Sequence, residues 1–226
     1  GLVGLVTEYV GFRRFTSVDG KITAALSSMA IGLVLADLVQ KKWGTEPVSI
    51  GVPDTLSRAG FTIAGVQVQW IQVIILVITF ALMIALHLVV AKTRIGRQIR
   101  AVAEAPVSAS LLGINVKRVT QSVFFISSAL AAVAGLLLAL RLGVANPDIG
   151  LTFGLKAIAI MAIGGIGDMR GAVIAGLAIG VLEALTFQFG LGRLGEMTVW
   201  LAMLLVLLFR RGGLFSAGVH TAEPRA

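Results

Sequence analysis

The sequence predicts an all-α protein, a polytopic transmembrane helix bundle that carries an amphipathic helical hairpin on one side of the membrane. Apolar residues make up 57% of the 226 residues and charged residues only 13%, which is too apolar a balance for a water-soluble domain. The apolar residues form continuous runs close to the length of about 20 that crosses a bilayer, whereas the strands of a membrane barrel alternate. A single long basic segment, residues 92–120, interrupts these runs.

We expect a single transmembrane domain over residues 1–226 with six apolar segments. These segments are residues 22–39, 68–90, 122–140, 151–166, 172–191 and 197–209. Residues 44–68, rich in glycine and proline, have loop composition with room for a short hairpin or a re-entrant piece. Because the chain begins in an apolar stretch without Met, we also expect it to be a fragment that lacks N-terminal spans.

Residues 92–120 are expected to form two short helices at the membrane surface. On a helix with about 3.6 residues per turn, one side is apolar and the other polar. The apolar side carries Ile95, Ile99 and Val102. The polar side carries Arg97, Arg100 and Glu104. Pro106 would end the first helix or begin the second, and Gly113 is a natural C-terminal stop.

Basic residues indicate the orientation of the chain, because loops on the cytoplasmic side of a membrane are enriched in Lys and Arg. If residues 92–120 are cytoplasmic, thirteen basic residues share their side. These are Arg13, Arg14, Lys21, Lys92, Arg94, Arg97, Arg100, Lys117, Arg118, Arg170, Arg210, Arg211 and Arg225. The opposite side receives five, which are Lys41, Lys42, Arg58, Arg141 and Arg193. The hairpin is therefore expected to face the cytoplasm.

Two apolar segments carry small residues at every fourth position, a pattern that lets helix backbones approach closely. The stripes are Ser127, Ala131, Gly135 and Ala139, and Ala172, Gly176, Gly180 and Ala184. They indicate either a place in the middle of the bundle, beside a solute pathway, or ordinary membrane packing. Gly164, Gly165 and Gly167 would permit a break between the fourth and fifth segments.

Glu183 is an acidic residue within an apolar segment, where a carboxylate is costly unless it is paired or faces water. It follows Gly176 and Gly180 on the same predicted helix face. Helix rise places Glu183 and Lys156 at a similar depth, so an ion pair between them is geometrically possible. A role in lining a pathway or in relaying protons stays open beside this structural one.

Other chemistry finds little support in the sequence. The chain has no cysteine, and its two histidines stand apart from other metal-ligating residues, so no metal site is expected. Aromatic residues that would stack on bases do not accompany the basic ones, which argues against nucleic acid. The only Gly-Lys pair, Gly20-Lys21, precedes Ile22, so there is no phosphate-binding loop and no cofactor is expected on this chain. A transporter driven by ATP would need another chain to bind the nucleotide.

Three blocks of the sequence together resemble the permease subunits of bacterial branched-chain amino acid ABC transporters, the LivH and LivM type. The blocks are GRQIRAVAEAPVSASLLGINVKRV, ALAAVAGLLLAL and GLKAIAIMAIGGIGDMRGAVIAGLAIGVLEAL, in the order and spacing of that family. The likeness is strongest over residues 92–186, and the LivH-like member is the closer one. The stretch GDMRG departs from the Gly-Ser-Ile-Pro-Gly of close members.

The resemblance implies a multi-pass subunit of the bacterial inner membrane that transports solute and is not itself an enzyme. Its partners would be a second permease subunit, two cytoplasmic ATP-binding subunits and a periplasmic solute-binding protein, with membrane lipid around it. Residues 92–120 would then be the coupling region that docks on the ATPase, through Arg97, Arg100, Ala101, Glu104, Ala109 and Gly113. The pathway or bundle core would include Gly135, Lys156, Gly164, Gly165, Gly167, Gly176, Gly180 and Glu183. A surface helix without a partner is the plainer interpretation of the same basic segment.

Three other functions remain compatible with the residues alone. An ion-coupled secondary transporter of small polar solutes would use Glu183 and Asp37 and would need no ATPase. An intramembrane enzyme would need two convergent polar groups, for which only Lys156 and Glu183 qualify. A structural membrane subunit would have no transport role. The solute follows only from the resemblance, whose members handle branched-chain and other amino acids, amides or urea.

Overall fold

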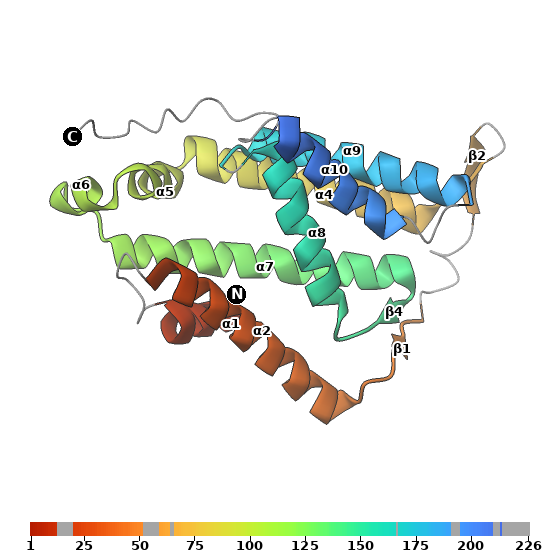
Figure 1. Ribbon diagram of the computed structural model, residues 1–226, viewed down its shortest axis with the longest axis horizontal. Coiled ribbons are helices and arrows are strands. Elements are labelled where there is room, and N and C mark those ends of the chain that lie inside the picture. The colour runs from red at the N-terminus through yellow and green to blue at the C-terminus, as the bar shows by residue number, and fades with distance from the viewer. Residues whose placement is uncertain are drawn as a thin grey trace. The chain divides into compact units, whose positions relative to one another are not determined.

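The structure is a computed structural model that describes residues 1–12, 20–51, 59–63, 66–165, 167–190, 195–209 and 213. The chain forms two compact units, Gly1–Asp148 and Ile149–Ala226. Helices dominate both units, and the strands are few and short (Figure 1). The predicted all-α class is therefore confirmed.

The first unit contains six helices among its described residues, together with a short π-helical turn. They are α1 (Leu2–Thr7) with the turn η1 (Glu8–Phe12), α2 (Gly20–Trp43), α4 (Trp70–Lys92), α5 (Arg94–Glu104), α6 (Pro106–Leu111) and α7 (Val116–Leu142). Helix α7 contacts both α1 and α4. Helices α4 and α7 thus form a pair to which the hairpin α5–α6 is joined.

Four short strands lie at the end of α4 and α7 that is remote from α5 and α6 (Figure 1). Strand β1 (Val48–Ser49) pairs antiparallel with β4 (Val144–Ala145), which places Val48 opposite Ala145. Strands β2 (Ala59–Ile63) and β3 (Val66–Gln69) form a second antiparallel pair with one irregularity between Ala59 and Phe61. The short hairpin considered for residues 44–68 is therefore present as β2–β3.

Among the described residues, three helices are long and apolar enough to cross a membrane. They are α4, α7 and α9 (Met169–Gln188). Three other apolar helical segments among the described residues are shorter. They are Leu2–Gly11, α8 (Ile149–Gly164) and the apolar part of α10 (Gly195–Phe209). Large apolar side chains along these helices are exposed, as expected of surface that meets lipid hydrocarbon.

Several element bounds differ from the expected segments for local reasons. The second segment begins at Trp70 because Val66–Gln69 forms β3, and it continues to Lys92. The fifth begins at Met169 because Asp168 caps the helix. The first expected segment, residues 22–39, lies within the longer helix α2.

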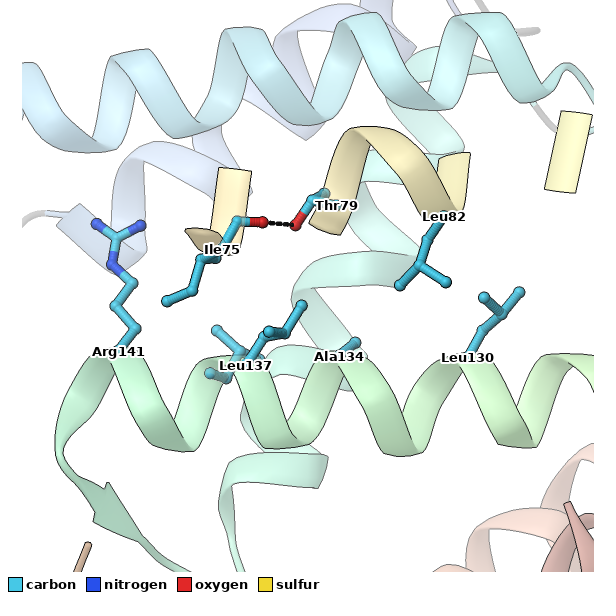
Figure 2. Close-up of a pocket in the computed structure, with 8 residues that line it drawn as sticks. Ile75, Thr79, Leu82, Leu130, Ala134, Leu137 and Arg141 are labelled. Atoms are coloured by element: carbon cyan, nitrogen blue, oxygen red, sulfur yellow. Dashed lines mark hydrogen bonds between the residues drawn. The ribbon is translucent and has the colours of Figure 1, made fainter. Parts of the chain in front are cut away.

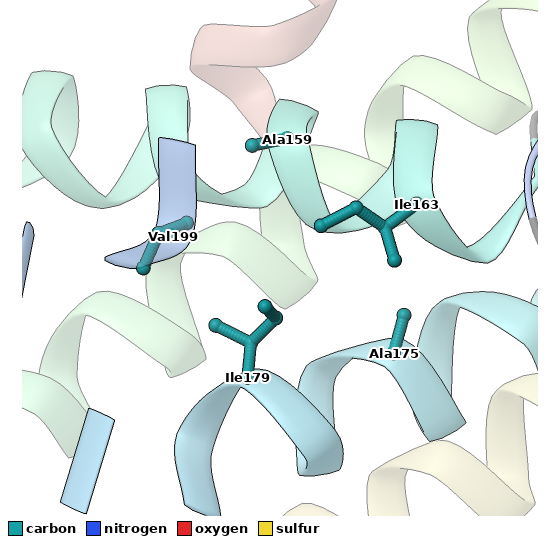
Figure 3. Close-up of a cluster of buried hydrophobic side chains, with 5 residues drawn as sticks. All are labelled: Ala159, Ile163, Ala175, Ile179 and Val199. Carbon is teal, nitrogen blue, oxygen red and sulfur yellow. The ribbon is translucent and has the colours of Figure 1, made fainter. Parts of the chain in front are cut away.

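The second unit is built on α8, α9 and α10, which contact one another. Its core is a cluster of five buried side chains, and Figure 3 shows them converging from the three helices. They are Ala159, Ile163, Ala175, Ile179 and Val199. The backbones of α8 and α9 lie close together at Gly164, where a Cβ would lie 2.5 Å from the carbonyl carbon of Gly171.

The buried positions of α9 each come one residue before the corresponding position of the predicted small-residue stripe. Gly171, Ala175 and Ile179 are buried at every fourth position. Gly176 still touches Ile160, since a Cβ would lie 3.6 Å from its Cγ2, whereas a Cβ on Gly180 would meet no described atom within 4 Å. Glu183 continues the buried row one turn beyond Ile179. A Cβ on Gly135 of α7 would likewise lie in open space within the described part of the chain.

Candidate functional site

The junction between α4 and α5 is a sharp turn fixed by one threonine and one glycine. The Thr93 hydroxyl accepts a hydrogen bond from the Gly96 N–H at 3.1 Å and donates one to the Val89 carbonyl at 2.6 Å. Thr93 is thus the N-cap of α5, which ties it to the last turn of α4. Any Cβ on Gly96 would collide with the Val90 carbonyl oxygen. Sequence reasoning missed both residues, although a threonine at the end of an apolar run is a recognisable cap signal.

Arg100 lies on α5 and joins the first arm of the predicted hairpin to the preceding helix, α4. Its guanidinium donates a hydrogen bond to the Val90 carbonyl, near the C-terminal end of α4. The last carbonyls of a helix lack partners within the helix and carry partial negative charge, so a cation there is favourable. Arg100 therefore holds α5 against the end of α4.

Helix α6 is short but closed at both ends by the chemistry the sequence predicts. Pro106 occupies its first turn, and the Ala105 N–H closes α5 by donating to the Ala101 carbonyl at 3.1 Å. At the other end Gly113 has a φ of 83°, and its N–H donates to the Ser110 carbonyl at 3.1 Å. The Ile114 N–H reaches the Ala109 carbonyl at 3.0 Å, which completes a Schellman stop. The predicted roles of Pro106 and Gly113 in bounding the second helix are confirmed.

The hairpin combines one anchored residue with an exposed apolar tip. Ala109 is buried, with 3% exposure, whereas Val107, Leu111 and Leu112 are 71%, 84% and 82% exposed. Figure 1 shows α6 lying beyond the ends of α4 and α7, away from the strands. Sequence reasoning had singled out the charged face and missed this tip, whose signal is the spacing of four between Val107 and Leu111.

Arg97 and Glu104 supply charge on α5, the helix that precedes the apolar tip. Both side chains are exposed. Neither forms an ion pair with another residue in the part of the chain that the structure describes. An exposed apolar patch rimmed by unpaired charges on a fixed backbone is typical of a surface that binds another protein.

The ion pair considered from the sequence is present in the second unit. Lys156 Nζ on α8 lies 2.8 Å from Glu183 Oε1 on α9, and the two side chains are 13% and 27% exposed. The ammonium also lies 5.3 Å from the centre of the Phe153 ring. Pairing offsets the cost of placing each charge in an apolar helix pair.

The two carboxylates considered for ion coupling are therefore both paired. Asp37 lies 3.1 Å from Lys41, one helical turn along α2, and both side chains are well exposed. Glu183 is held by Lys156. This arrangement gives no support to a secondary transporter that uses them.

The glycine-rich break between α8 and α9 occurs where the sequence predicts it. Helix α8 ends at Gly164, and Gly165 and Gly167 have φ values of 106° and 98°, which a side chain would strain. Asp168 then caps α9 by accepting hydrogen bonds from the N–H groups of Arg170 at 2.8 Å and Gly171 at 3.4 Å. The contacts of the GDMRG stretch are thus those of a tight turn and a helix cap.

A further acidic residue escaped the sequence reasoning, which took the first ten residues as the remnant of a helix. Glu8 begins the π-helical turn η1 and is 6% exposed. Its Oε2 accepts no hydrogen bond within the described part of the chain. Groups of three acidic or histidine side chains that could hold a metal ion are absent among the described residues.

Spanning-length apolar helices with exposed apolar surface, two of them joined by a basic hairpin, define a multi-pass membrane protein. Comparison with known proteins specifies its family. Residues 1–209 match the family described as the permease component of the branched-chain amino acid transport system, and the chain belongs to this family.

Its relatives are permease proteins of bacterial transport systems. The high-affinity branched-chain amino acid permease BraD of Pseudomonas aeruginosa is 32% identical over 213 residues, which cover 93% of this chain and 69% of the relative. The corresponding permease LivH of Salmonella typhimurium is 36% identical over 217 residues, with the same coverage. The ribose import permease RbsC of Haemophilus influenzae is 30% identical over 170 residues, covering 73% of this chain and 52% of the relative. No solved structure matches the chain at a significant level.

Proposed function

We propose that this chain is the membrane-spanning subunit of an ABC importer that moves branched-chain amino acids into the cytoplasm. The chain would bind no nucleotide. ATP would be hydrolysed by two cytoplasmic subunits, a periplasmic binding protein would deliver the solute, and a second permease subunit would complete the pathway in the inner membrane. Family membership supports the class of transporter, and the names of the relatives that match most of the chain support the solute.

The observation that carries this proposal is the surface of the α5–α6 hairpin. The Thr93 cap and the Arg100 hydrogen bond fix the hairpin to α4, so a force on its tip is transmitted to a spanning helix. The exposed apolar side chains of Val107 and Leu111 can enter a groove on a partner, and Arg97 and Glu104 can pair with charges around it. We therefore assign docking to the α6 tip and its charged rim, and transmission to the residues at the base of the hairpin.

The assignment has a direct test, because these 226 residues contain no cysteine and an introduced cysteine is the only one among them. A Leu111→Cys variant, co-expressed with ATPase subunits that carry single cysteines around their permease-facing groove, should form a disulfide cross-link. A Leu76→Cys variant is the matched control, since Leu76 is also an exposed leucine but lies on the spanning helix α4. Cross-linking at Leu111 and not at Leu76 is the expected result. Labelling of Leu111→Cys only from outside the cell would contradict the proposed orientation and the docking role together.

Charge reversal separates docking from the folding of the hairpin. Arg97→Glu and Glu104→Lys change exposed groups without internal partners among the described residues, so both variants should insert normally. We expect uptake of labelled leucine to fall several-fold while the ATPase subunits continue to hydrolyse ATP. Uptake at the level of the unmodified protein in both variants would count against coupling through this hairpin.

A further inference from the structure

An elongated groove of about 340 Å³ lies between α4 and α7 in the first unit (Figure 2). One face of α7 forms a wall of the groove and includes Leu130, Ala134 and, at one end, Arg141. The other wall comes from α4, with Leu82 toward the Leu130 end and Ile75 toward the Arg141 end. Both helices are long and apolar enough to span a membrane, so we expect the groove to run along the hydrocarbon layer.

The groove is apolar along its length and cationic at one end. Among the described lining residues one, Thr79, carries a hydroxyl, and this hydroxyl donates a hydrogen bond to the Ile75 carbonyl of the same helix at 2.8 Å. The Arg141 guanidinium forms no ion pair with any other described residue. Among the described residues that line the groove there is no carboxylate. The site therefore offers hydrocarbon contact and a single uncompensated positive charge.

We infer that this groove binds one acyl chain of an anionic phospholipid, whose phosphate pairs with Arg141. The distance along α7 from Leu130 to Arg141 is about 16 Å at a rise of about 1.5 Å per residue, which suits an extended acyl chain. Arg141 lies in the last turn of α7, just before Gly143 ends the helix, so the cation sits at the end of the apolar run. Arginine binds phosphate with two parallel hydrogen bonds, which makes charge complementarity specific.

A free amino acid fits the groove less well than a lipid. The ammonium group of a zwitterion needs a negatively charged partner, and the described lining supplies no carboxylate; the Thr79 hydroxyl can accept only one of the three ammonium N–H groups. An anionic lipid needs only the cation and the apolar walls. The inference thus concerns a lipid site beside the spanning helices and does not depend on which solute is transported.

The test uses the complete transporter in nanodiscs that contain a photoactivatable phosphatidylglycerol with the reactive group on its acyl chain. Peptide mapping should find the label on α4 and α7. Arg141→Gln should lower this labelling about 10-fold or more, the equivalent of one hydrogen bond to a charged group. Arg141→Lys should retain more of it, and Ala134→Phe should block the groove without removing the charge.

The matched control is Lys42→Gln, which removes an exposed cation from the end of α2 but lies outside the groove. Its labelling should equal that of the unmodified protein. Equal labelling by a phosphatidylcholine probe, unaffected by Arg141→Gln, would overturn the inference. So would protection of the groove by the transported solute, or a disulfide between an Ala134→Cys variant and a second permease subunit. Uptake by the same variants tests the proposed transport function separately, because lipid labelling and solute uptake are independent readouts.

Discussion

The Lys156–Glu183 ion pair allows the most quantitative prediction. Its two side chains are 13% and 27% exposed, and its atoms are 2.8 Å apart. Removing one partner of a fully buried pair costs about 3–5 kcal/mol, because the other charge is left buried and alone. Neither side chain is fully buried here, so the loss should be smaller than for a fully buried pair. We therefore expect Lys156→Met or Glu183→Gln to lower the free energy of unfolding by about 2 kcal/mol.

The double variant distinguishes pairing from independent effects. If the two groups interact, the combined loss should be smaller than the sum of the single losses by about 1–2 kcal/mol, within the range seen for contacting residues. The measurement is reversible unfolding of the purified protein in mixed micelles with increasing denaturing detergent. The Asp37–Lys41 pair is the control, because it is well exposed and should show a coupling of only about 0.3–0.5 kcal/mol. Additive losses at Lys156 and Glu183 would refute the reasoning.

Three further predictions concern helix ends and close approach. Thr93→Ala should lower the stability of the hairpin by about 1 kcal/mol, while Thr93→Ser should retain the cap, as measured by amide hydrogen exchange across α5. Gly113→Ala should cost about 1 kcal/mol because of the positive φ, and normal exchange in α6 would contradict the proposed stop. Gly164→Val should separate α8 from α9, because its Cβ meets the backbone of Gly171, and should lower the free energy of unfolding by about 1–3 kcal/mol or more, as measured from the unfolding midpoint. Gly180→Ala is the control and should be tolerated, because a Cβ there lies in open space among the described residues.

The hairpin shows how far local sequence rules reach. Pro106 and Gly113 could be assigned from sequence because each acts through its own backbone geometry, whatever surrounds it. The place of Arg100 could not, because an arginine on a polar helix face has the same periodicity whether it meets solvent, a partner or the end of the preceding helix. Its hydrogen bond to Val90 depends on the angle of the turn at Thr93 and Gly96.

The α8–α9 pair shows a similar division. Depth along two helices made the Lys156–Glu183 pair possible, but the contact needs the two helices to be neighbours with the right rotation about their axes. The same rotation decided that Gly171 and Ala175, and not the stripe one residue later, face the core. In a membrane helix nearly every position is apolar, so hydrophobic periodicity does not identify the packed face.

The amino-acid sequence by itself determined the class of this protein, the approximate extent of its apolar helices and the breaks between them. These features depend on composition, run length and backbone chemistry, which are properties of short stretches of chain. Only the tertiary structure decided which charged groups are paired, which face of each helix is buried, and that an apolar groove ends at Arg141. Those features arise between helices far apart in the sequence, where the rotation and angle of packed helices, and not local preference, bring side chains together.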